Sequence, residues 1–242
     1  MSTQALHLGD LTVDVVFKDI KNVHLSVYPP TGRVRISAPS AMPMETVRLF
    51  AISRVGWIRK QQQRQRDQER ETPREYLERE SHSLWGRRYL LRVIEGAERA
   101  TVQLSHRQIE LHVPTGADQH QRAEILDHWY RQELRAAVAA SLPTWEQRLN
   151  VKVERFFIQR MKTKWGGSHP ERRTIRLNLE LAKKDRECLE YVLLHELAHF
   201  LVPHHGDGFV AVLDRHMPNW RHVQQHLNAL PLGAIGDEGE ID

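Results

Sequence analysis

The chain has 242 residues, of which 40% are hydrophobic and 27% are charged, with a net charge of +4 at pH 7. This length fits one large domain or two small ones, and the composition excludes a chain that is disordered throughout. No uncharged stretch reaches the roughly 18 apolar residues of a membrane-spanning helix, and the first ten residues lack the features of a secretory signal. A single cysteine excludes an internal disulfide. We therefore expect a cytoplasmic protein without a membrane segment.

The charged residues and the histidines limit the possible partners. There are 35 Lys and Arg against 31 Asp and Glu, a small excess that predicts only weak, non-specific binding of nucleic acid. Histidine occurs 15 times in the chain. A histidine-rich chain with one cysteine is a candidate for a metal site built from imidazole groups.

Alternation of apolar and polar residues predicts β-strands in the first third of the chain, at residues 11–15, 23–28 and 34–38. The sequence Pro-Pro-Thr-Gly at residues 29–32 supplies a turn between the second and third strands, which we expect to form a hairpin. From residue 44 to 58 the apolar residues recur with the period of a helix.

A charged, glutamine-rich segment at residues 59–80 follows. Its basic and acidic residues nearly balance, so we interpret it as an exposed helical extension or linker that is interrupted near Pro73. A nucleic-acid-binding arm is the alternative. Strand patterns return at residues 89–94, 101–104 and 109–113, which we expect to form a β-meander.

The second half of the chain alternates between helical and strand-like patterns. A helix is predicted at residues 121–142, limited by Pro143, and an apolar helix at residues 185–202, limited by Pro203. The remaining predicted elements are strands at 151–158 and 174–179 and short helices at 208–216 and 220–227. We find no internal repeat in the sequence.

These elements predict an α+β fold with two domains and a tail. The first domain is β-rich and covers residues 1–116, including the charged segment. The second covers residues 117–232 and is built around the apolar helix. Residues 233–242 are acidic and contain glycine, so we expect this tail to be disordered.

The apolar helix carries the sequence His195-Glu196-Leu197-Ala198-His199, an HExxH pattern. Residues four apart on a helix have Cβ atoms about 5–6 Å apart, so two imidazole groups can bind one metal ion. Glu196 is rotated by about 100° from His195 and can take a proton from water activated by the metal. The alternative is a pair of core histidines satisfied by hydrogen bonds, which the strongly apolar flank makes less favourable.

A catalytic zinc site needs three protein ligands and one open position. The third ligand is expected where the chain turns back after Pro203, at His204 or His205. His205 precedes Gly206, which tolerates a sharp turn, and this favours His205 only modestly. Asp207 is expected to cap the helix that follows.

Other polar residues near the motif are weaker candidates. Cys188 lies seven residues before His195, about 10.5 Å along the helix axis, too far to share its metal, and is expected to be a buried apolar residue. Tyr191 could donate to an oxyanion, although a core tyrosine with one hydrogen bond is favoured. The sequence does not decide whether Lys164 and Trp165 line a cleft or pack against a strand.

Several short sequence runs in residues 161–232 resemble those of a known protein family. They are Met-Lys-Thr-Lys-Trp-Gly at 161–166, Arg-Leu-Asn-Leu-Glu-Leu at 176–181 and Cys-Leu-Glu-Tyr-Val-Leu-Leu directly before the HExxH pattern. His204-His205, Phe209 and Met-Pro-Asn-Trp at 217–220 follow. Together they resemble the YgjP-like metallopeptidase family, also called the domain of unknown function 45 family, which is similar to SprT-like peptidases of the zincin fold.

The resemblance implies a zincin-like metallopeptidase domain at residues 117–232. It further implies a zinc ion (Zn2+) held by His195, His199 and His205, with Glu196 as the catalytic base, and a peptide or protein substrate. The third ligand is thereby assigned to His205 by the resemblance.

The sequence departs from the usual family pattern at residues 165–168. The family usually has Trp-Gly-Ser-Cys where this chain has Trp165-Gly166-Gly167-Ser168, which affects the expected substrate preference but not the expected metal site. Two other functions stay open, a SprT-like protease recruited to nucleic acid for crosslink repair and a non-catalytic, metal-stabilised binding module. The sequence leaves the substrate and the oligomeric state undetermined.

Overall fold

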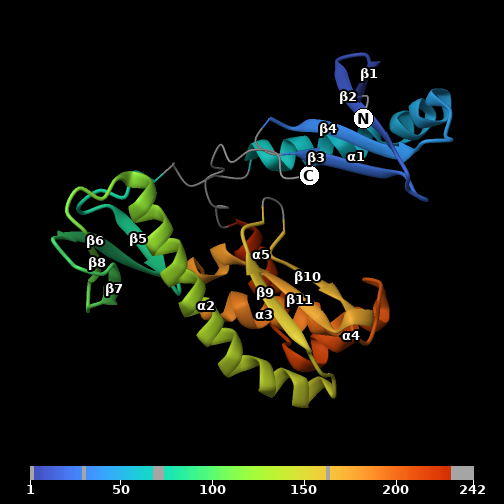
Figure 1. Ribbon diagram of the computed structural model, residues 1–242. Coiled ribbons are helices and arrows are strands. Elements are labelled where there is room, and N and C mark those ends of the chain that lie inside the picture. The colour runs from blue at the N-terminus through green and yellow to red at the C-terminus, as the bar shows by residue number, and fades with distance from the viewer. Residues whose placement is uncertain (1–2, 29–30, 68–73, 162–163, 230–242) are drawn as a thin grey trace. The chain divides into compact units, whose positions relative to one another are not determined.

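The computed structural model describes residues 3–28, 31–67, 74–161 and 164–229 (Figure 1). Its mixed helices and sheets confirm the predicted α+β class. Contacts divide the described residues into two compact units, residues 3–67 and residues 74–229, and each unit has its own hydrophobic core. None of the described helices has the length and apolar character needed to cross a membrane.

The first unit is a four-stranded sheet with one helix. Its strands lie in the order β1 (Thr3–Leu8), β2 (Leu11–Lys18), β4 (Arg33–Pro39) and β3 (His24–Tyr28). The central β2–β4 pair is parallel and the two outer pairs are antiparallel, which confirms the predicted hairpin. The helix α1 (Met44–Asp67) starts where the period changes and continues beyond residue 58.

The core of the first unit follows from the alternation in its strands. Val13 and Ile36 are fully buried on one face of the sheet, because successive strand residues point to opposite faces. Val47, Ala51 and Ile58 of α1 are fully buried too, at spacings that place them on one face of the helix.

The second unit begins with another four-stranded sheet. The order is β5 (Ser81–Leu84), β6 (Arg87–Glu95), β8 (Gln108–Val113) and β7 (Thr101–Leu104), again with a parallel central pair and antiparallel outer pairs. The expected β-meander is therefore wrong, because β8 inserts between β6 and β7. The same order of pairing occurs in both sheets.

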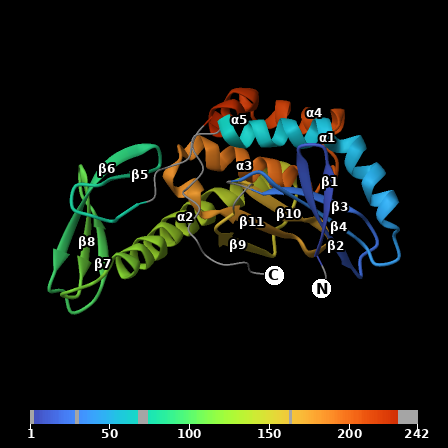
Figure 2. The same cartoon turned by 90° about the horizontal axis from the view of Figure 1, so that it is seen from above.

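The helix α2 (Gln119–Leu149) is longer than the sequence predicts, and Pro143 lies inside it. Asp118 begins the helix with a capping box, in which its carboxylate accepts from the backbone N–H of Gln121. A proline removes one helical hydrogen bond, but burial of Trp145 and Leu149 beyond it keeps the chain helical. Figures 1 and 2 show α2 running from the sheet of β5–β8 toward the sheet of β9–β11.

The rest of the second unit combines a small sheet with helices. Its strands lie in the order β10 (Gly166–His169), β11 (Thr174–Asn178) and β9 (Arg155–Gln159), with β9 and β11 parallel and β10 antiparallel to β11. The sequence did not predict β10. The helices are the short 3-10 helices η1 (Pro170–Arg172) and η2 (Leu179–Lys183), followed by α3 (Arg186–Ala198), α4 (Asp207–His216) and α5 (Trp220–Ala229).

The division into units differs from the domain boundary expected at residue 116. The sheet of β5–β8 shares one core with the elements that follow, because α2 packs on β7 and β8 and also on η2 and α3. The charged segment is helical as far as residue 67, while residues 68–73, including Pro73, lie outside the described residues. The acidic tail at 233–242 lies outside them as well.

Candidate metal centre

The helix α3 positions the HExxH pattern in the core of the second unit. Nine of its 13 residues are buried, so the side chains of the helix have little freedom. The helix ends at Ala198 with His199 as its C-cap, earlier than the predicted end at residue 202. The chain then continues in tighter turns of the 3-10 type, because the N–H groups of Phe200 and Leu201 each donate a hydrogen bond to the carbonyl oxygen three residues before.

His195, His199 and His205 come together in the structure. One ring nitrogen from each lies within 4.8 Å of the others, and the Nε2 atoms of His195 and His205 are 3.2 Å apart. Zinc–nitrogen bonds of about 2.0–2.1 Å at tetrahedral angles place ligand nitrogens about 3.3–3.4 Å apart, so this spacing fits zinc. His204 does not belong to the group. Three imidazole groups in this arrangement can hold one divalent metal ion.

Contacts behind the rings orient two of the histidines. The Nδ1 of His199 lies 3.4 Å from the carbonyl oxygen of Val202, and the Nδ1 of His195 lies 3.5 Å from the hydroxyl of Tyr191. With hydrogen on Nδ1, each ring offers the lone pair of Nε2 to a metal, an arrangement common in metalloproteins. The Tyr191 hydroxyl accepts a hydrogen bond of 2.8 Å from Gln224.

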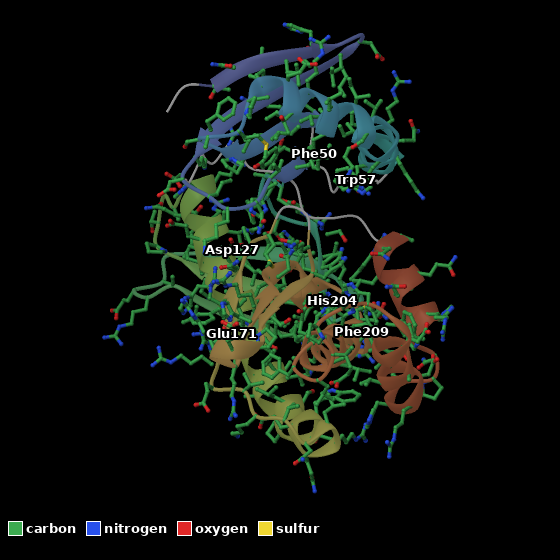
Figure 3. The ribbon with its side chains drawn as sticks, turned by 90° about the vertical axis from the view of Figure 1, so that its right-hand side faces the viewer. Phe50, Trp57, Asp127, Glu171, His204 and Phe209 are labelled. Atoms are coloured by element: carbon green, nitrogen blue, oxygen red, sulfur yellow. The ribbon has the colours of Figure 1, made fainter. Side chains whose placement is uncertain are left out.

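Phe209 of α4 packs against all three histidines. Its ring centroid lies 4.7–5.0 Å from the centroids of the three imidazole rings, and its side chain is buried (Phe209 and His204 are labelled in Figure 3). Gly206, and not Asp207, is the N-cap of α4, so the expected capping by Asp207 is wrong. Asp207 is instead the first residue of the helix, where an acidic side chain interacts favourably with the helix dipole.

Burial favours the neutral form of His195 and His199, which is the form that binds metals. Burial first, and then the neighbouring His199 and His205, lower the pKa of His195 to about 4. Burial and His205 likewise lower the pKa of His199. A neutral imidazole has a free lone pair, so these two rings need to lose no proton before they bind a metal at neutral pH.

Glu196 is nearly buried, at 5% exposure, and does not belong to the histidine group. Burial raises its pKa to about 7, while a hydrogen bond from Ser168 and the charge of Lys164 act in the opposite direction. Gly166 of β10 faces this carboxylate. A Cβ atom on Gly166 would lie 2.6 Å from Oε1 of Glu196 and 2.9 Å from the side chain of Val192, so only glycine fits there.

The histidines and Glu196 line a single cavity of about 570 Å³. Its lining includes Lys164 and Trp165, which answers the question that the sequence left open, and Tyr191. The other lining residues are Gly166, Gly167, Ser168, Pro170, Val192, Pro203, Gln224, Leu227 and Asn228. The cavity is large enough for a few residues of an extended peptide.

A family model described as a YgjP-like metallopeptidase domain matches residues 21–230. The chain belongs to this YgjP-like family. It is therefore a metal-dependent peptidase that requires a divalent metal ion and acts on a peptide or protein substrate. The match confirms the resemblance found in the sequence.

Two solved structures are also similar to the chain. The metallopeptidase zymogen abylysin of Pyrococcus abyssi is 20% identical, with 37% of this chain and 90% of that chain covered and a TM-score of 0.35. The metallopeptidase zymogen jannalysin of Methanocaldococcus jannaschii is 25% identical, with 37% and 92% covered and a TM-score of 0.34. No curated protein sequence matches the chain significantly.

Gly167 and Ser168, the two residues that differ from the usual YgjP-like sequence, line the cavity that also contains Glu196. Ser168 stands where the family usually has cysteine, and its hydroxyl bonds to Glu196. A Cβ atom on Gly167 would meet nothing within 4 Å, so this replacement leaves open space beside the cavity.

Sequence reasoning missed the supporting roles of Phe209, Gly166 and Gln224. The first two stand in the runs that resemble the YgjP-like family, but only the fold shows what they contact. Gln224 has no such signal in the sequence, because it reaches Tyr191 from a different helix.

Cys188 is fully buried and outside the histidine group, as the helical distance predicts. Burial first, and then Asp185 and Glu187, raise the pKa of its thiol to about 11. Cys188 lies near Asp185 and His226, which contact each other at 3.0 Å. Asp185 and His226 are exposed, and their contact is a hydrogen bond at the surface.

Proposed function

We propose that the chain is a zinc peptidase in which His195, His199 and His205 hold one zinc ion and Glu196 is the general base. The observation that carries this proposal is the convergence of three imidazole groups beside a separate buried carboxylate in one cavity. A zinc ion with three protein ligands keeps a position open, where it can polarise water or a carbonyl oxygen.

Glu196 has the position of a proton carrier. Its carboxylate faces Gly166 and Ser168 and is held apart from the three ring nitrogens. From there it takes a proton from the attacking water and returns it to the amine that leaves when the peptide bond breaks. The hydroxyl of Ser168 holds the carboxylate in one orientation.

The edge strand β10 gives the substrate a place to bind. Within the described sheet, β10 pairs with β11 on one side, and its other edge is not paired. An extended peptide can add to such an edge through backbone hydrogen bonds. Because Gly166 begins β10 and contacts Glu196, a peptide on this edge lies beside the base.

The two other functions that the sequence left open have less support. A purely structural metal site would use a fourth protein ligand, and the donor group among the described residues contains three histidines and no fourth member. Binding of nucleic acid stays a prediction of weak, salt-sensitive association, and a complex that survives about 0.2 M salt would contradict it.

The test combines metal analysis with peptide cleavage. We expect one zinc per chain by elemental analysis, and cleavage of casein-derived peptides that stops with chelator and returns with zinc. The Glu196→Gln variant keeps the size of the side chain and removes the base, so it should retain zinc and lose at least 100-fold in kcat/KM. Loss of zinc in this variant, or wild-type protein without a stoichiometric metal, would contradict the proposal.

A further inference from the structure

The cavity contains one cation of the protein in addition to the proposed metal. Lys164 lies in the connection between β9 and β10 and lines the cavity. Apart from the histidines, the lining of the cavity contains one basic residue, Lys164, and one acidic residue, Glu196. The side chain of Lys164 is exposed, so its ammonium group is available to a ligand in the cavity.

The backbone of Lys164 is fixed by Asn178. The side-chain amide of Asn178 donates hydrogen bonds of 2.8 Å to the carbonyl oxygens of Lys164 and Met161. The backbone N–H of Asn178 donates to the carbonyl of Trp165 at 2.9 Å. Asn178 itself is completely buried. Lys164 therefore extends from a defined point of the cavity wall.

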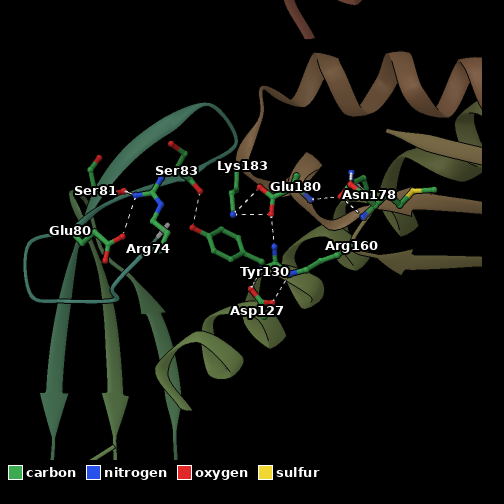
Figure 4. Close-up of polar contacts among 11 residues, drawn as sticks. Arg74, Glu80, Ser81, Ser83, Asp127, Tyr130, Arg160, Asn178, Glu180 and Lys183 are labelled. Carbon is green, nitrogen blue, oxygen red and sulfur yellow. Dashed lines mark hydrogen bonds and ion pairs between the residues drawn. The ribbon is translucent and has the colours of Figure 1, made fainter. Parts of the chain in front are cut away.

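A second anchor precedes Lys164 in the chain. The guanidinium group of Arg160 contacts both carboxylate oxygens of Asp127 on α2 and, at 2.9 Å, the buried carboxylate of Glu180 (Figure 4). Glu180 also pairs with Lys183 at 2.9 Å. These neighbouring cations are each paired with an acid.

Lys164 differs from those cations. No hydrogen bond or ion pair joins its ammonium group to another residue in the described parts of the chain, although its charge acts on Glu196. Burying an ammonium group under a substrate costs free energy unless the substrate offers an anion or another acceptor. A divalent metal ion held by the histidines would add further positive charge to the cavity.

We propose that Lys164 selects substrates with a carboxylate close to the scissile bond. The proposal rests on the proposed function and adds the substrate class. Lys164 precedes Gly166 by two residues, and an extended chain advances about 3.3–3.4 Å per residue. Because Gly166 contacts Glu196, the carboxylate belongs within about two residues of the bond that is cut. It is an acidic side chain or the C-terminal carboxylate of the peptide.

Measurements of peptide binding test the proposed role of Lys164 without requiring cleavage. Zinc-loaded Glu196→Gln protein is titrated with fluorescent peptides that differ only by Glu or Gln at each position, each with a free or an amidated C-terminus. We expect about tenfold tighter binding when one position near the centre is Glu, or when the C-terminus is free, and the two series distinguish the sources. Adding Lys164→Met should abolish the preference, and Lys164→Arg should retain it. The matched control is Lys152→Met, because Lys152 is exposed and pairs with Glu146 outside the cavity lining.

The ratio between the binding affinities for acidic and for neutral peptides decides the outcome. Equal binding of Glu and Gln peptides, or a preference that survives Lys164→Met, overturns the proposal, and so does a lack of binding by all peptides. Cleavage by the protein with native Glu196 is then measured on the same peptides. Charge-selective binding without any cleavage would contradict the proposed function and leave the role of Lys164 standing.

Discussion

At the scale of single residues, the site depends on how closely Gly166 approaches Glu196. A side chain at residue 166 would occupy the space of the carboxylate, so the position of the proposed base on α3 depends on the lack of a side chain at this residue of β10. Ser168, two residues further along β10, bonds to the same carboxylate. One short strand therefore fixes Glu196 in two ways.

Gly166→Ala tests this contact. The added methyl group must displace Glu196 or Val192, and overpacking of this kind costs about 1–3 kcal/mol of stability. We expect kcat/KM to fall by at least tenfold while the zinc content stays at the wild-type value, measured by peptide cleavage and elemental analysis. Gly56→Ala in α1 is the control, since a Cβ atom there meets nothing within 4 Å. Wild-type activity in Gly166→Ala would show that Glu196 is not held by this contact.

The third ligand can be tested with adjacent histidines. His205 belongs to the group of ring nitrogens, whereas His204 does not. We expect His205→Ala to lose most of its zinc on dialysis and His204→Ala to retain it, as measured by elemental analysis. The reverse result would place the third ligand one residue earlier.

At the scale of secondary structure, the sequence predicted most elements but fewer of their limits and partners. The alternation in β2 and β4 and the helical period in α1 were sufficient, because one buried face produces each pattern. Pro143 misled the prediction of α2, since tertiary packing of Trp145 and Leu149 outweighs one lost hydrogen bond. The strand β10 has the sequence Gly-Gly-Ser-His, which carries no strand pattern.

The site shows the same division between local and distant information. Two histidines four residues apart on a helix can be recognised from the sequence, because the helix alone determines their spacing. The packing of Phe209 on the rings and the approach of Gly166 could not be derived this way. They depend on how α4 and β10 pack against α3.

The segment between β9 and β10 depends on Asn178, the last residue of β11. In Asn178→Asp a carboxylate replaces the amide and repels the carbonyl oxygens of Met161 and Lys164. Each buried group left without its partner costs about 1–3 kcal/mol. Because Gly166 follows this segment, we expect a 10- to 100-fold lower kcat/KM with zinc retained.

Hydrogen exchange of residues 161–166 provides a second readout for Asn178→Asp, and we expect it to become faster. Asn219→Asp is the control, since Asn219 is exposed and donates to Glu187. Unchanged exchange in the segment would contradict the role of Asn178.

At the scale of the whole molecule, stability should fall in mild acid because of His82. Its side chain is 3% exposed, and burial together with the charges of Arg74 and Lys183 lowers its pKa from 6.5 to about 3. Glu80, at 3.8 Å, does not compensate for this. Below pH 6.5 the unfolded chain takes up a proton that the folded protein refuses, so the free energy of unfolding decreases as the pH falls toward 3.

The expected loss is about 2 kcal/mol between pH 6.5 and pH 5. It can be measured by thermal unfolding of zinc-free protein at several pH values, since acid also releases metals from histidine. His82→Gln should flatten the dependence on pH, whereas His106→Gln, at an exposed turn, should leave it unchanged. Equal slopes in wild type and His82→Gln would show that His82 is not responsible.

The shared strand order of the two four-stranded sheets extends to the way in which each sheet leads into its helix. The strand β4 ends at Pro39 and β8 ends one residue before Pro114, and Ser or Thr follows each proline. The next helix starts five residues after the proline, at Met44 and Gln119. The chain therefore uses the same arrangement of strands and helix twice, although its sequence contains no internal repeat. The unit of residues 3–67 has a core of its own and contributes no described residue to the cavity lining, so substitutions in its core should leave the zinc content of the protein unchanged.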